Sequence, residues 1–464
     1  MNESSADEVV SGIAQFVHQR ATGRPGEYMM CEGGHATLYA SCFAAMTLHY
    51  VGHLVDVSIS DRQAWVDYIN GWQQAESGLF VGPELAPEEM ILPRYEWDHH
   101  TMHLTAHVLP ALYVLGGQPA YCLHFAHKFV DLDYLRGWLE RRDWTQAWME
   151  GNNLLFVGQF LVHLRDFENC PKAQQALDLY FDWLDGEQDP NTGLWGTQAG
   201  CSLPHAVFGG YHQLLVYYYC GRPVKYPERV IDSVLSLQHD DGGFAPQGGG
   251  GACQDVDAAD ILVSLYERTG YRPSDIRKAL RSLLYSVLDK MTPDGGFIGR
   301  LGEPWIHHGL LRTYAPPDVP ELFSTWFRTH TIALICQLLD DEPLAQAPWQ
   351  FNTTCSMGWH ATLPIPAASS ASPAVSSVIH VPSLATRTPT PTPTSPPLPR
   401  RLRSWFLGRP LRAALRRFPS TLAFRLLAAF IERYVPLLPQ TEAAQFLLNV
   451  DRRLYPYLED YVIS

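Results

Sequence analysis

Gln238-His-Asp-Asp-Gly-Gly-Phe244 is the stretch of sequence that decides the fold, because looser copies of it recur along the chain. Each copy has a polar or acidic residue, then a glycine, then an aromatic residue; the copies lie at 76–80, 188–195 and 292–297, with a degenerate one at 142–144. The last three aromatic residues stand roughly 50 residues apart, which is typical of a repeated supersecondary unit. Each loop separates two apolar segments, so the sequence predicts repeated units of helix, glycine-rich turn and helix.

Six segments around these loops are apolar nearly all round and predict helices that are buried on both sides. They begin near residues 33, 98, 152, 204, 255 and 322. More polar segments, such as 64–74 and 172–185, have the pattern of helices that cover them from outside. The sequence therefore predicts an all-α fold, an (α/α)6 toroid of six inner and six outer helices. An open superhelix of helical hairpins is the alternative that the same repeat allows.

Three regions of different composition divide the chain. We expect the toroid to span 1–360, followed by a linker at 361–399 that is rich in Pro, Ser and Thr, and by a basic helical tail at 400–464. The tail begins with an amphipathic, arginine-rich segment at 400–418. That segment is suited either to peripheral contact with an anionic membrane or to packing as a small helical appendage.

Charge and cysteine content exclude several classes of protein. The net charge of −14 disfavours a general nucleic-acid-binding role. The nine cysteines are scattered and contain no C-x-x-C pair, which argues against a disulfide framework or a zinc ribbon. The acidic start of the chain does not have the pattern of a signal peptide, so we expect a cytoplasmic protein that is at most peripheral to a membrane.

The loops that end at Trp195, Phe244 and Phe297 resemble the repeats of a known superfamily. They are similar to the QW repeats of squalene and oxidosqualene cyclases and to the repeats of protein prenyltransferase β subunits. The segment Asp255-Val-Asp-Ala-Ala259 is in turn similar to the D-x-D-D-T-A motif of class II terpene cyclases, with alanine at the third aspartate and at the threonine. The resemblance implies an α/α toroid that protonates and cyclises a linear isoprenoid, such as a polyprenyl diphosphate or squalene. It implies that Asp257 is the proton donor.

Three aspartates in or directly after this segment are the candidate catalytic residues. Protonation of a double bond needs a carboxylic acid that keeps its proton at neutral pH, which burial and a nearby like charge achieve by raising its pKa. Asp255 and Asp257 are suited to form such a coupled pair. Asp260 lies one helical turn further and is placed to supply the charge that Ala258 lacks. For Asp255 alone, the alternative is a structural role in capping the start of a helix.

Polar and aromatic residues at the other helix starts are the candidate substrate-binding residues. A stripe of imidazoles is the most unusual feature, because His100, His103 and His107 share one helical face. Arg328 is the best candidate for holding an anionic head group. The predicted substrate-binding residues are His35, Trp97, Asp98, His100, His103, Asn152, Asn153, His205, Tyr211, His308, Trp326 and Arg328.

Protonation itself needs no cofactor, and we assign no metal ligand among these residues. Mg²⁺ would accompany a diphosphate substrate, and zinc held by the histidines is the less favoured alternative.

Two other classes of function fit the same fold. One is a toroid hydrolase or lyase that acts on a carbohydrate, with Asp98, Glu150, Asp255 and Asp257 as candidate acids and bases. The other is a non-catalytic scaffold, which the alanines at 258 and 259 allow. The distances between carboxylates distinguish the first from a cyclase.

Overall fold

The computed structural model describes residues 6–89 and 97–361. Nearly all of the predicted linker and the whole of the predicted tail, including its segment at 400–418, lie outside the described residues. The predictions made for them therefore stay predictions. Within the two described ranges, none of the helices has the length and apolar character needed to cross a membrane.

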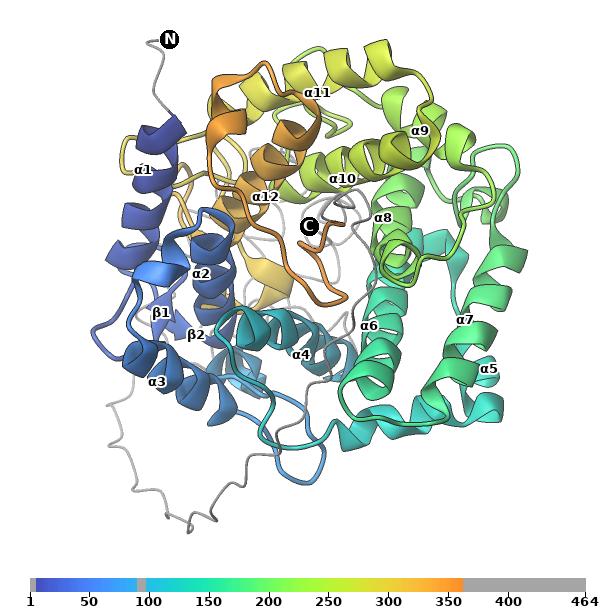
Figure 1. Ribbon diagram of the computed structural model, residues 1–464, viewed down its shortest axis with the longest axis horizontal. Helices are drawn as coiled ribbons and strands as arrows, with labels where there is room; N and C mark the ends of the chain where they lie inside the picture. The colour runs from blue at the N-terminus through green and yellow to red at the C-terminus, as the bar shows by residue number, and fades with distance from the viewer. Residues whose placement is uncertain (1–5, 90–96, 362–464) are drawn as a thin grey trace, which may run out of the picture.

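Six inner helices surround one axis and form a closed ring (Figure 1). Each contacts the next along the chain, and the last also contacts the first, so the all-α toroid is confirmed and the open superhelix is not formed. The inner helices are α2 (Leu38–Tyr50), α4 (Trp97–Val114), α6 (Ala147–Asp166), α8 (Leu203–Tyr219), α10 (Ala252–Thr269) and α12 (Leu322–Leu338).

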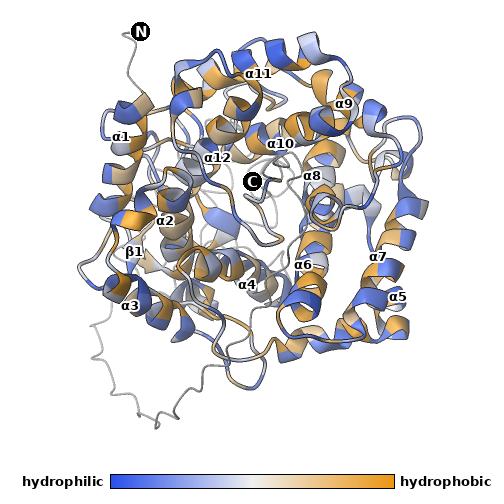
Figure 2. Ribbon diagram, viewed as in Figure 1, coloured by the Kyte–Doolittle hydropathy of each residue, from blue (hydrophilic) through white to orange (hydrophobic). Residues whose placement is uncertain are grey.

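Six outer helices pack around this ring. They are shorter or more amphipathic than the inner ones, and Figure 2 shows them as mixtures of hydrophilic and hydrophobic residues. By contrast, every residue of α2 except His49 is buried, as expected for a helix enclosed on both sides. The outer helices are α1 (Ala6–Gln19), α3 (Ile59–Asn70), α5 (Leu132–Leu139), α7 (Ala173–Glu187), α9 (Pro227–Leu235) and α11 (Pro273–Leu288).

Short elements connect the helices. A small antiparallel sheet pairs β1 (Tyr28–Met29) with β2 (Ala36–Thr37), in the register Tyr28 to Thr37. The 3-10 helices are η1 (His53–Asp56), η2 (Pro83–Leu85), η3 (Pro87–Glu89), η4 (His124–Val130), η5 (Trp144–Gln146), η6 (Thr197–Ala199), η7 (His307–Gly309), η8 (Leu311–Thr313) and η9 (Pro343–Gln346).

The repeated loops share one turn structure. A glutamine side chain donates a hydrogen bond to a glycine carbonyl within its own loop: Gln188 to Gly193 at 2.7 Å and Gln238 to Gly242 at 2.9 Å. Gly242 has a φ of 89°, and a Cβ there would lie 2.5 Å from the Ser282 carbonyl oxygen. The glycine is therefore required by both backbone conformation and space.

Four of the loops, those at 76–80, 142–144, 238–244 and 292–297, are tied to the inner helix that follows them. The backbone N–H of Phe80 donates to Thr105 Oγ1, that of Phe244 to Asp255 Oδ1 and that of Phe297 to Thr325 Oγ1, at 3.0–3.1 Å. In the degenerate loop the N–H of Asp143 donates to Glu150 Oε1 at 3.0 Å. We call these four acceptors the anchor residues: Thr105, Glu150, Asp255 and Thr325.

Different segments lie at the two ends of the axis. The loop that carries η7 lies over the N-terminal halves of α2, α4 and α12, because the His307 ring packs against Tyr39 and Phe323. Residues 348–361 cross the opposite end, where Trp359 packs against Tyr219 and His360 lies 3.3 Å from Glu267 (Figure 1). The interior of the ring is thus enclosed at the end that 348–361 covers.

Candidate active site

A small cavity lies on the axis of the toroid. Its described lining combines five imidazoles with one carboxyl, one amide and several apolar side chains. The lining residues are His103, His107, Trp148, Asn152, His212, Cys253, Asp257, His307, His308, Phe323, Phe327 and Met357.

The anchor residues explain why these side chains face the axis. Successive helical residues are turned by about 100°, so the residues two before and two after an anchor point almost directly away from the anchored loop. In α10 the anchor Asp255 is flanked in this way by Cys253 and Asp257, and both line the cavity. The same arrangement holds in three more helices, with the pairs His103 and His107, Trp148 and Asn152, and Phe323 and Phe327.

Asp257 is the carboxyl group of the described cavity lining. Its side chain is 1% exposed, and its Oδ2 has no hydrogen-bond partner among the described residues. Burial, followed by the charges of Asp260 and Asp255, raises the pKa of Asp257 well above its ordinary value. The raised pKa favours the protonated form of this carboxyl, which is the form that can donate a proton.

Asp260 and Tyr211, which were predicted as a catalytic and a substrate-binding residue, lie outside the cavity lining. Asp260 accepts a hydrogen bond from Ser264 Oγ at 3.1 Å, and burial raises its pKa to about 6. Of the two nearby charges that raise the pKa of Asp257, that of Asp260 has the larger effect. Asp260 therefore influences the cavity through Asp257. Tyr211 is fully buried.

Asp255 and Arg328 form a buried ion pair that belongs to the framework, not to the cavity. Arg328 Nη1 lies 3.1 Å from Asp255 Oδ2, and both side chains have 0% exposure. The guanidinium also donates to the carbonyl oxygens of Ile298, Gly250 and Gly299. Internal bonds therefore occupy both Asp255, which was predicted to be catalytic, and Arg328, which was predicted to hold an anionic head group. The two roles stay predictions.

His212 has a fixed tautomer and offers a lone pair to the cavity. Its Nδ1 donates to the Phe208 carbonyl oxygen at 2.7 Å, so in the neutral ring Nε2 carries no proton. Burial, with a smaller contribution from the nearby His107, lowers the pKa of His212 to about 4. His107 is held in the same way, through Nδ1 to the His103 carbonyl oxygen at 2.8 Å.

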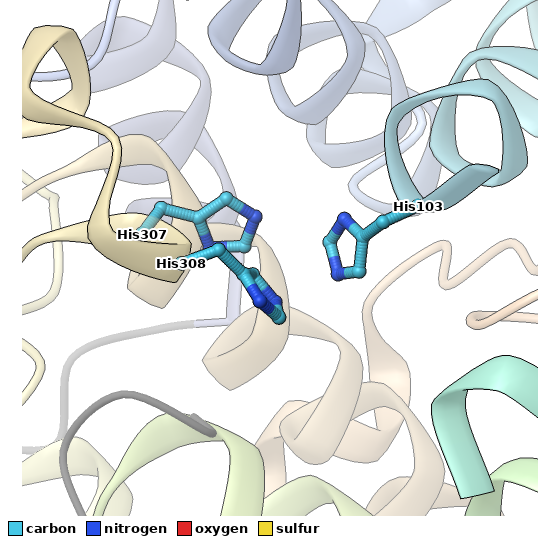
Figure 3. A group of neighbouring side chains, drawn as sticks. All are labelled: His103, His307 and His308. Carbon is cyan, nitrogen blue, oxygen red and sulfur yellow. The ribbon is translucent and has the colours of Figure 1, made fainter. Parts of the chain in front are cut away.

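Three further imidazoles face one another across the cavity (Figure 3). His103 comes from α4, whereas His307 and His308 come from η7 on the opposite side. The ring centroids of His103 and His308 are 4.0 Å apart, and those of His307 and His308 are 4.7 Å apart. One ring nitrogen of each residue lies within 4.8 Å of the other two. Tyr39 holds the His103 ring at its Nδ1 edge, because the Tyr39 hydroxyl lies 2.6 Å from that nitrogen.

Several predicted site residues lie outside the cavity lining. His35 and Asp98 are exposed, and Asn153 is bonded to Glu150 and His99. His100 is buried with its Nε2 3.4 Å from the His308 carbonyl oxygen.

Some of the remaining predicted site residues lie outside the cavity lining, and others line the cavity. His205 is half-buried against Trp148, and Trp326 stacks on Phe43 in the core. Trp97 begins α4, and its side chain lies outside the described residues. Four predicted residues are brought together in the cavity: His103, Asn152, Asp257 and His308.

Eight lining residues are absent from the predicted set: Trp148, Cys253, Phe323, Phe327, Met357, His107, His212 and His307. The first four were accessible to a helical argument, because each stands four residues from another lining residue on the same helix. Met357 gives no such signal, since it follows the last helix in an irregular segment.

Comparisons with known proteins give distant structural similarity. No protein-family model and no curated protein matches the chain. A solved polysaccharide lyase has a TM-score of 0.42 at 13% identity, and the match covers 73% of this chain and 99% of that one. A glycosyl hydrolase family 88 protein from Bacteroides vulgatus has a TM-score of 0.41 at 12% identity, covering 72% and 99%. A possible GH105 member from Salmonella enterica serovar Paratyphi A has 0.36 at 12%, covering 73% and 96%.

The interpretation as a terpenoid cyclase or prenyltransferase relative, acting on an isoprenoid, is wrong. The similar solved structures named above are a polysaccharide lyase and glycosyl hydrolases. Asp255 and Arg328, to which that interpretation gave a catalytic and a head-group-binding role, are bound to each other outside the cavity lining. Likenesses at this distance concern the fold and assign no reaction to this chain.

Proposed function

We propose that this protein is an enzyme that hydrolyses a glycosidic bond in a neutral carbohydrate, with Asp257 as general acid and His212 as general base. One observation carries the proposal: a carboxyl and an imidazole line one cavity, and their pKa values are displaced in opposite directions. These displacements favour the protonated form of the acid and the neutral form of the base. This is the division of roles that acid–base catalysis needs.

The chemistry of the lining supports a sugar as substrate. Imidazoles and the Asn152 amide provide hydrogen-bond donors and acceptors for hydroxyl groups, while Trp148 and Phe323 provide flat apolar faces for the C–H side of a sugar ring. The described lining contains no lysine or arginine, which favours a neutral substrate over an anionic one. Elimination beside a carboxylate would need that negative charge to be neutralised, so the lining favours hydrolysis.

The proposed steps follow from the two groups. Asp257 gives its proton to the glycosidic oxygen as the bond from that oxygen to the anomeric carbon breaks. His212 Nε2 takes a proton from the water that attacks the same carbon, so one product gains a hydroxyl at that carbon and the other keeps the bridging oxygen. Proton exchange with solvent then restores both groups. The pairs of carboxylates considered from sequence do not form, because Asp98 is exposed and Glu150 is bonded to Arg142.

The test is a panel of neutral and uronate-containing oligosaccharides incubated with the full-length protein, with reducing ends and unsaturated products measured separately. We expect new reducing ends without unsaturated product, and a loss of about 10²–10⁴-fold in kcat/KM for both Asp257→Asn and His212→Gln. The matched control is His330→Gln, which changes a buried histidine outside the cavity and should keep the activity. Unsaturated products would show that the reaction is an elimination and not a hydrolysis. Full activity in Asp257→Asn would overturn the proposal.

A further inference from the structure

His103, His307 and His308 have the composition of a metal site. They bring three neutral nitrogen ligands together from two segments that are far apart in the sequence, and all three are buried. Nitrogen ligands at about 2.0–2.1 Å around a tetrahedral ion stand roughly 3.3 Å apart. Because the ring nitrogens already lie within 4.8 Å of one another, small ring rotations would complete the geometry.

His307 supplies an independent observation, because its side chain is buried without a partner. It is 1% exposed, and neither Nδ1 nor Nε2 makes a hydrogen bond within the described part of the chain. A buried polar group without a partner is costly, and one so placed in a native protein calls for a ligand, an ion or a water. The His307 ring points into the space that His103 and His308 also face (Figure 3).

The loop that carries η7 is built to present these rings. His308 adopts φ 47° and ψ 31°, a left-handed conformation that is unfavourable for a residue other than glycine. The loop holds it there, because the His307 N–H donates to Thr313 Oγ1 at 2.9 Å and Trp305 exchanges two backbone hydrogen bonds with Ala315.

Tyr39 provides the outer contact that a metal-bound imidazole needs. A ligating histidine generally uses its second ring nitrogen to bond a neighbouring acceptor, which fixes the ring orientation. The Tyr39 hydroxyl lies 2.6 Å from His103 Nδ1, which leaves His103 Nε2 for an ion. The backbone N–H of Tyr39 is in turn held by the buried carboxylate of Glu84 at 2.9 Å.

We infer that His103, His307 and His308 bind one divalent transition-metal ion, with Zn²⁺ as the ion that three imidazoles suit best. Three protein ligands leave a fourth position, which faces the cavity that Asp257 and His212 line. The inference is independent of the proposed function, because the site consists of other side chains and its occupancy is measured without a substrate.

The experiment removes bound metal from the full-length protein with a chelator, adds Zn²⁺ back and measures how much is bound and how tightly. We expect one Zn²⁺ per chain by elemental analysis, and at least about 100-fold weaker binding in calorimetry for His103→Gln and His307→Gln. His330→Gln is the matched control, because His330 is equally buried and equally unpartnered within the described residues but belongs to no ligand cluster; it should bind zinc normally. Circular dichroism checks that each variant is folded.

Two further measurements test the inference even if a histidine variant does not fold. Tyr39→Phe leaves all three ligands in place and should weaken binding by about 10–100-fold. Co²⁺ should give the visible absorbance of a tetrahedral nitrogen site, without the thiolate charge-transfer band that binding to cysteines would produce. Absence of bound Zn²⁺, a thiolate band, or equal affinity in His307→Gln and wild type would overturn the inference.

Discussion

Helices α10 and α12 are two copies of one structural unit with different chemistry at matching positions. Asp255 and Thr325 anchor the preceding loops in the same way, through the N–H groups of Phe244 and Phe297. Two residues after each anchor, α10 places Asp257 in the cavity, whereas α12 places an aromatic ring there. The repeat therefore fixes the anchor and the direction of its neighbours, while leaving their chemistry free to vary. Function in this fold is to be sought beside the anchors, not at them.

Changing the cavity position should have the largest effect, and mainly on activity. Asp257→Asn removes the proton donor and should lower kcat/KM by about 10²–10⁴-fold. Its free energy of unfolding should stay within about 1 kcal/mol of wild type, because an amide replaces a group that is already neutral. Phe327→Leu, the matching change in α12, should mainly raise KM. Steady-state kinetics measure the activity of both variants, and urea unfolding measures their stability. Equal losses of kcat in the two variants would contradict the comparison between the helices.

Changing the anchor of α10 should instead act on stability. Asp255→Ala leaves Arg328 buried without its partner and should lower the free energy of unfolding by about 3–5 kcal/mol. Urea denaturation measures the loss. In the double variant with Arg328→Met, much of the stability should return, since no uncompensated charge remains. A double variant as unstable as the single one would show that the ion pair is not the reason.

Five residues after the anchors, the two helices should respond to pH in opposite directions. Burial raises the pKa of Asp260 to about 6 and lowers that of His330 to about 3. Between pH 3 and 6.5 the unfolded state binds more protons at position 330, so His330 costs stability as the pH falls below 6.5. Between pH 3.8 and 6 the folded state binds more protons at position 260, so the contribution of Asp260 falls as the pH rises.

Variants at these two positions test the opposition. His330→Gln should lessen the loss of stability on acidification and Asp260→Asn should increase it, each by up to about 1.4 kcal/mol per pKa unit of displacement. Urea unfolding at several pH values between about 4 and 7 measures both slopes. Slopes that change in the same direction would contradict the assignment.

The anchor of α12 should give the smallest effect. Thr325→Val keeps the shape of the side chain but removes the acceptor of the Phe297 N–H, which should lower the free energy of unfolding by about 1–3 kcal/mol. Activity should survive, because Phe323 and Phe327 keep their direction. Hydrogen exchange at the Phe297 amide should rise in the variant, and unchanged protection would show that the anchor is dispensable.

Sequence reasoning predicted the fold well because the repeat is visible in loop residues that make the same hydrogen bonds, such as those of Gln188 and Gln238. It did not foresee that Asp255 would face its loop, because two carboxylates in one short motif suggested a coupled pair. A helix turns residues two apart to nearly opposite sides, so Asp255 faces its loop while Asp257 faces the axis. Contacts made by loops distant in sequence, such as those of His307, leave no pattern from which the cavity could be assembled.

The segment at 348–361 gives the ring a blind end. Met357 forms part of the floor of the cavity, and the segment is fastened to the ring through Trp359 on Tyr219 and His360 near Glu267. A polymer has no way to thread through such a ring and slide along it. Under the proposed chemistry only a chain terminus fits the site, so the protein would trim its substrate from one end and release short products through the side by which they entered.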